Sequence, residues 1–125
     1  MTNGCCRGRR SVRVTGEVRQ WLRDLRRTDP ASYESVRVAV DKVAEVGPGL
    51  GRPPLRGSSI SNLKELRPRS SIRVLFVFDP WSQAVLLVAG NKAGNWTRWY
   101  QQNIPVAEVA YKVWLDNERE RSGES

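Results

Sequence analysis

Residues 62–79 constrain the fold more than any other part of the chain, because they read as two strands joined by a short turn. Residues 72–78 place a large apolar side chain at every even position. Side chains of a strand point alternately to opposite faces, so Arg73 projects away from this apolar row. On the preceding strand, Glu65 and Arg67 share one face. A rigid, charged sheet of this kind suits the binding of a phosphodiester, although a solvated charged face is the simpler interpretation.

The chain is small and strongly basic. Its 125 residues are enough for one domain with a modest core. The formal net charge of +8 indicates a polyanionic or acidic partner, although charge alone does not exclude a generally basic soluble protein. No apolar run is long enough to cross a bilayer, and no apolar stretch of a signal peptide follows the basic start. We therefore expect a cytoplasmic protein that does not bind membranes.

Cysteine and histidine usage narrows the possible chemistry. Cys5 and Cys6 are neighbours, which rarely form an unstrained disulfide with each other. Without histidine or a second cysteine pair, the sequence argues against a zinc site, and we expect two free thiols in a flexible arm. The absence of histidine also removes the usual general base, so catalysis must use carboxylate, Lys, Arg or Tyr.

The first half of the chain predicts a helical hairpin. Val12 and Val14 suggest a short strand before a helix that begins near Gly16, whose apolar side chains have the spacing of one helical face: Val18, Trp21, Leu22 and Leu25. Asp29, followed by proline, is the expected N-cap of a second helix, which runs to about residue 46 and ends at Gly47.

The second half predicts a sheet and a last helix. The continuous apolar run of residues 84–89 is typical of a central strand covered on both faces, within an antiparallel meander. Residues 90–95 have the composition of a loop, and Pro105 is expected to open the last helix.

The expected fold class is therefore α+β, with an N-terminal helical hairpin on an antiparallel sheet and a C-terminal helix. We expect one domain over residues 14–116, between a flexible basic arm (1–13) and a disordered charged tail (117–125).

Three groups of residues are candidates for chemistry. The first group is the cationic and acidic set on the two strands, where arginine matches phosphate with two parallel donors: Lys64, Glu65, Arg67, Arg69 and Arg73. Lys92, in a glycine-flanked loop, is the second. The third is the aromatic and arginine-rich run of residues 95–100, which can stack unpaired bases. Its alternative role is structural, with Trp96 and Trp99 pinning the last helix to the sheet.

These residues resemble the RelE/HigB-like toxins of type II toxin–antitoxin systems, most closely a HigB-like branch. The order of strand, helical hairpin, antiparallel sheet and terminal helix is that of the family, and the resemblance extends from Val14 to about residue 115. The motifs that carry it are Leu-Lys-Glu-Leu-Arg at 63–67, Ile-Arg-Val-Leu-Phe at 72–76, Leu-Leu-Val-Ala-Gly-Asn-Lys at 86–92 and Gly-Asn-Trp-Thr-Arg-Trp-Tyr at 94–100.

The resemblance implies an endoribonuclease that cleaves mRNA in the ribosomal A site and inhibits translation. Arg73 matches the strand arginine that contacts the scissile phosphate, and Lys92 matches the basic residue after the last strand. Glu65 and Arg67 match the neighbouring Glu-Leu-Arg strand. Further RNA contacts are expected from Lys64, Arg69, Asn95, Trp96, Arg98 and Tyr100. The chain departs from many relatives in having no histidine, and Tyr100 is a candidate for the family tyrosine.

Such chemistry requires neither metal nor cofactor. RNA is cut when its own 2′-hydroxyl attacks the adjacent phosphorus, and Arg73 and Lys92 would stabilise charge on the phosphorane oxygens. Glu65 would either act as the base or orient a neighbouring arginine, and the sequence gives these two roles similar weight.

The alternative from a different functional class is a non-enzymatic basic binding protein, such as a ParE-like gyrase poison or an inactive toxin homologue. The resemblance also implies a cognate antitoxin, expected to be acidic and of the helix-turn-helix type. It could cover the Arg73/Lys92 face, or bind the hairpin, whose outer face is rich in arginine: Arg19, Arg23, Arg26, Arg27 and Arg37. The arginines favour the hairpin.

Overall fold

The computed structural model describes residues 10–47, 55, 57–69, 71–91, 94 and 96–121. Cys5 and Cys6 lie outside the described residues, so the expectation of free thiols is not addressed. Along the chain, the elements are β1 (Val12–Val14), α1 (Gly16–Thr28), α2 (Pro30–Val46), β2 (Lys64–Arg69), β3 (Ile72–Phe78), β4 (Ala84–Asn91) and α3 (Trp96–Arg121).

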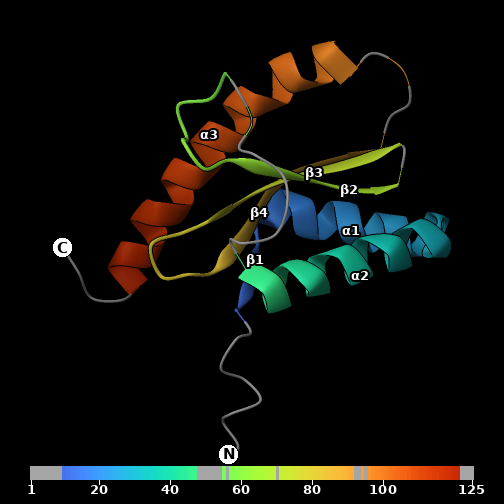
Figure 1. Cartoon of the computed structure of the whole chain (residues 1–125), viewed down its shortest axis with the longest axis horizontal. Helices are drawn as coiled ribbons and strands as arrows, with labels where there is room; N and C mark the ends of the chain where they lie inside the picture. Colours follow the sequence, from blue (N-terminus) through green and yellow to red (C-terminus); the bar gives the residue numbers. More distant parts are fainter. Residues whose placement is uncertain are drawn as a thin grey trace, which may run out of the picture.

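Helices cover both faces of a four-stranded sheet (Figure 1). The α1–α2 hairpin packs on one face over a core that includes Val36, Val74 and Phe76. α3 packs on the other face over a second core that includes Leu75 and Leu87. The α+β class, the N-terminal hairpin and the C-terminal helix are therefore confirmed.

The sheet has the strand order β1-β4-β3-β2, and its topology is mixed. β2, β3 and β4 form the expected antiparallel meander. β4 is an interior strand and is buried on both faces, as its continuous apolar run predicts. β1 pairs with β4 in parallel, and α1, α2, β2 and β3 lie between these two strands in the sequence. The expected antiparallel sheet is thus confirmed for β2, β3 and β4, and β1 adds a parallel edge strand.

A side-chain N-cap starts each helix of the hairpin, and the one predicted for α2, Asp29, is confirmed. The Thr15 side chain accepts a hydrogen bond from the Val18 amide at the start of α1. Asp29 caps α2 by accepting from the amide and the hydroxyl of Ser32, at 3.2 and 2.6 Å. These bonds lower the pKa of Asp29, since they favour the charged carboxylate. At the end of α2, Gly47 adopts a positive φ of 76°, which glycine accommodates without strain.

α3 is longer at both ends than the sequence suggests. It begins at Trp96, so Pro105 lies inside the helix instead of opening it. Proline removes one helical hydrogen bond, but Pro105 is exposed, where water can satisfy the freed carbonyl. At the other end, α3 continues to Arg121, and Glu118 is buried with only 7% exposure. Residues 117–121, expected in a disordered tail, are therefore helical.

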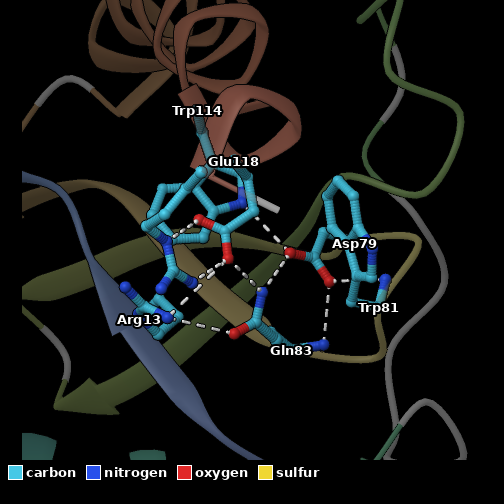
Figure 2. Close-up of polar contacts among 7 residues, drawn as sticks. Arg13, Asp79, Trp81, Gln83, Trp114 and Glu118 are labelled. Atoms are coloured by element: carbon cyan, nitrogen blue, oxygen red, sulfur yellow. Dashed lines mark hydrogen bonds and ion pairs between the residues drawn. The ribbon is translucent and has the colours of Figure 1, made fainter. Parts of the chain in front are cut away.

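A network of polar contacts fixes the C-terminal half of α3 to the sheet (Figure 2). The buried Asp79, at the end of β3, accepts hydrogen bonds from Trp114 Nε1 at 3.0 Å and from Gln83 Nε2 at 2.8 Å. The Arg13 guanidinium of β1 lies 5.0 Å from the centre of the Trp114 ring and 3.8 Å from Glu118. Arg13 thus belongs to the folded domain and not to the expected flexible arm.

Candidate active site

Arg73 lies near the start of β3, on the opposite face from the core under the hairpin. Its guanidinium carbon is 4.5 Å from the centre of the Trp96 ring, in the first turn of α3. Arg73 Nη1 donates hydrogen bonds to the carbonyl oxygens of Ile72 and Arg69, at 2.9 and 3.2 Å. The side chain is thus held between a rigid strand and an aromatic ring, and the sequence correctly predicted its face.

Glu65, Arg67 and Tyr100 meet beside Arg73. The Glu65 side chain is only 5% exposed, whereas that of Arg67 is 42% exposed. Arg67 donates to one Glu65 carboxylate oxygen from Nε at 2.9 Å and from Nη2 at 2.7 Å. The Tyr100 hydroxyl donates to the other carboxylate oxygen at 2.5 Å. Both oxygens of Glu65 therefore already accept hydrogen bonds within the protein.

Electrostatic interactions in this cluster shift the pKa values of Tyr100 and Arg67. Burial raises the pKa of Tyr100, and its bond to Glu65 raises it further, while Arg73 opposes these effects. The hydrogen bond to Glu65 raises the pKa of Arg67. Tyr100 is therefore a neutral phenol at physiological pH, and Arg67 is a permanent cation.

An aromatic cluster of Trp96, Trp99 and Tyr100 fixes the start of α3 against β4. Trp99 is buried at 7% exposure, and its ring centre lies 5.4 Å from that of Trp96 and 5.3 Å from that of Tyr100. The Trp99 indole lies against Gly90, where a Cβ atom would be 2.4 Å from Trp99 Nε1. Gly90 is also the cross-strand neighbour of Arg73. The structural role considered for this run is thus confirmed for Trp99, while Trp96 and Tyr100 are half-buried beside Arg73.

A bulge in β4 places Gly90 on the face of the sheet that α3 covers. Leu75 pairs with Val88 and Phe76 pairs with Leu86, so Leu87 is an extra residue on β4. Strict alternation from Ala84 would place Gly90 under the hairpin instead. Gly90 was expected in a loop, but it is part of β4 and packs against Trp99.

The side chains of two predicted cations, Arg69 and Lys64, lie on the opposite face of the sheet from the Arg73 side chain. The register of β2 shifts between Leu66 and Arg69, so Arg69 turns to the hairpin side, where its Nε donates to Ser35 Oγ of α2 at 3.1 Å. Lys64 pairs across the strands with Phe76, which faces the hairpin core. The first candidate group is therefore split between two faces, with Glu65, Arg67 and Arg73 together on one of them.

Of the remaining predicted site residues, the structure describes Arg98. It is exposed in the first turn of α3, upstream of Pro105, where the last helix was expected to begin. Lys92 and Asn95 lie outside the described residues. Over the ranges that the structure does describe, no cluster of three metal-ligating side chains occurs, and no helix combines the length and apolarity needed to cross a membrane.

Comparisons with known proteins agree on one family. Residues 23–112 match the family described as phage-derived Gp49-like proteins. A Mycobacterium tuberculosis protein named as the candidate toxin HigB3 is 47% identical over 112 residues, which cover 86% of this chain and 96% of that protein. The candidate toxin HigB2 of the same organism is 46% identical over 111 residues, which cover 81% of this chain but 54% of that protein.

One solved structure, a mutant of Escherichia coli toxin RelE in the free state, is similar in fold. The TM-score is 0.51 at 17% sequence identity, over 66% of this chain and 83% of that chain. At this identity the similarity concerns the fold alone. The family match and the identity to both HigB relatives show that this chain belongs to the Gp49-like family, among the HigB-like toxins with a RelE-like fold.

Proposed function

We propose that this protein is the toxin of a type II toxin–antitoxin system and inhibits translation by cleaving mRNA. The observation that carries the proposal is the convergence of Arg73, Arg67, Glu65 and Tyr100 at the start of α3. The HigB relatives support the toxin assignment and imply a cognate antitoxin. Cleavage takes place in the cytoplasm, on messages in the ribosomal A site.

The proposed reaction is transesterification by the RNA itself. The 2′-oxygen forms a bond to phosphorus, the bond from phosphorus to the 5′-oxygen breaks, and the proton lost by the 2′-hydroxyl is balanced by one gained at the leaving oxygen. Arg73 stabilises the negative charge on the phosphorane oxygens, and Lys92, which directly follows β4 in the sequence, assists it. Guanidinium and ammonium groups can supply this charge, so we assign no metal to the mechanism.

Glu65 acts in this proposal by orienting its neighbours and not as the general base. A base needs a carboxylate oxygen that can take a proton from the substrate, but Arg67 and Tyr100 occupy both oxygens of Glu65. Arg67 extends from this anchor with a side chain that is 42% exposed, so it can reach a phosphate. Trp96, Arg98 and Asn95 contact the neighbouring nucleotides. We leave Lys64 and Arg69 out of the cleavage site, because they belong to the hairpin side of the sheet.

Mapping the 5′ ends of cellular mRNA after brief induction of the protein tests this function. The proposal expects new ends at fixed positions within codons, and their loss when ribosomes are kept off the message. Intact mRNA together with damaged DNA would instead identify a gyrase poison. Growth arrest with both nucleic acids intact would show that the protein acts by binding alone.

A further inference from the structure

A stripe of exposed valines runs along the outer side of α3. Figure 1 shows this helix at the periphery of the molecule, on the opposite face of the sheet from the hairpin. Its inner side, which includes the buried Trp99 and Ala107, packs on the second core. Val106, Val109 and Val113 lie on its other side and are 42%, 65% and 52% exposed. Residues at this spacing share one helical face, so the three side chains form an apolar stripe in water.

The charges beside this valine stripe are balanced, although the whole chain carries a net charge of +8. At 3.6 residues per turn, four exposed charged side chains share the outer side of α3 with the valines: Arg98, Lys112, Asp116 and Glu120. Two are cations and two are carboxylates. A surface that binds RNA or the ribosomal backbone is expected to carry an excess of positive charge. The neutral valine stripe therefore suits a protein surface better than a nucleic acid.

The outer side of α3 is complementary to itself. Val109 is eleven residues from both Arg98 and Glu120, and eleven residues are close to three whole turns, so all three side chains point the same way. A second α3, turned end for end about Val109, brings its Glu120 to the Arg98 of the first copy. Val106 of one copy then lies beside Val113 of the other, because these residues are three and four positions from the centre. A dimer with two-fold symmetry requires a self-complementary surface of this kind.

We propose that the protein forms a weak homodimer in which two α3 helices pack antiparallel through the valine stripe. Arg98 of each copy pairs with Glu120 of the other, at both ends of the interface. Parallel packing would instead set like charges against each other at both ends. A helix of 26 residues is about 39 Å long and offers only a small interface, so we expect a dissociation constant of about 1–100 μM.

Dimerisation has a consequence for RNA binding. Arg98 follows two positions after Trp96, whose ring covers Arg73. Arg98 is also among the residues proposed above to contact nucleotides, and the dimer would place a carboxylate of the second copy beside it. The second copy and RNA would then compete, and the monomer would be the active form. This consequence rests on the proposed function, whereas dimerisation itself does not.

Sedimentation equilibrium of the purified full-length protein tests the interface, over a range of concentrations at fixed ionic strength. We expect a monomer–dimer equilibrium whose dissociation constant rises about tenfold or more in Val109→Glu, because the substitution puts two carboxylates at the centre of the interface. Val38→Glu is the matched control, since Val38 is 53% exposed but belongs to α2, and it should leave the equilibrium unchanged. Circular dichroism checks that both variants are folded.

Two results of this experiment would overturn the dimer. One is a protein that stays monomeric up to about 1 mM, which would leave the valine stripe to another partner or to water. The other is a dimer that Val109→Glu and Val38→Glu weaken equally, which would place the interface elsewhere.

Charge reversal tests the antiparallel arrangement. Arg98→Glu and Glu120→Arg should each raise the dissociation constant about threefold or more, because each change brings like charges together at both ends. The combined variant should recover the affinity of the unmodified protein, since the exchanged charges attract each other again. A combined variant that dimerises no better than the single variants would rule out this pairing.

An oligonucleotide of 2′-methoxy RNA tests the competition separately from cleavage, because it has no 2′-hydroxyl to attack the phosphorus. We expect it to bind the Val109→Glu monomer more tightly than the unmodified dimer, and to shift the unmodified protein toward monomer. Equal binding to the two proteins, or binding to neither, would overturn the competition. The sedimentation results would still decide whether the dimer exists.

Discussion

Replacing Gly90 with alanine should disturb the active site through a single methyl group. The new Cβ atom would lie 2.4 Å from Trp99 Nε1 and 2.7 Å from Cε2, so the indole must move by about 1 Å to reach an ordinary contact of 3.4 Å. Gly90 is within β4 and has no positive φ, so the alanine backbone itself is unstrained. Overpacking of this kind should lower the free energy of unfolding of the Gly90→Ala protein by about 1–3 kcal/mol.

The displacement should also reduce activity, because Trp99 packs against Trp96, and Trp96 covers Arg73. Thermal unfolding should show a midpoint lower by about 4 °C for each kcal/mol lost. Gly16→Ala is the matched control, since its Cβ would meet no atom within 4 Å. Adding Trp99→Phe to Gly90→Ala should recover part of the stability by shortening the ring. A Gly90→Ala protein with unchanged stability and cleavage rate would refute this packing argument.

Three further predictions concern stability and titration. Val74→Ala empties a site with 1% exposure and should lower the free energy of unfolding by about 2 kcal/mol, measured by urea denaturation. Trp114→Phe removes the indole N–H that donates to Asp79 and should lower the free energy of unfolding by about 1–3 kcal/mol. If the variant were as stable as the unmodified protein, this hydrogen bond would not contribute to stability. Tyr100 should ionise above its ordinary pKa of 10.0, followed by ultraviolet absorbance with Tyr100→Phe as the reference. Its raised pKa contributes stability that is fully present below pH 10.0 and is lost as the pH rises through the raised value.

Periodicity and capping signals were sufficient to predict the hairpin and the central strands. The alternation of residues 72–78 correctly separated Arg73 from the core, and Asp29 marked the start of α2. These signals are local, since each reflects side chains within a few positions of one another.

The features that sequence reasoning missed depend on contacts between distant segments. The bulges at Leu87 and after Leu66 reverse the alternation, and so put Gly90 beside Trp99 and Arg69 beside Ser35. Glycine and asparagine just before Trp96 suggested a long loop, although packing on Gly90 stabilises an early helix start. The bond from Tyr100 to Glu65 joins positions 35 residues apart, and no local pattern indicates it.

Reconstitution with translating ribosomes tests whether Arg73 stabilises the transition state of mRNA cleavage. Single-turnover cleavage of a programmed message should be about 10²–10³-fold slower with Arg73→Ala than with the unmodified protein. Lys64→Ala, on the opposite face of the sheet, is the matched control and should cleave at nearly the normal rate. Full activity of a folded Arg73→Ala protein would show that Arg73 does not stabilise this transition state.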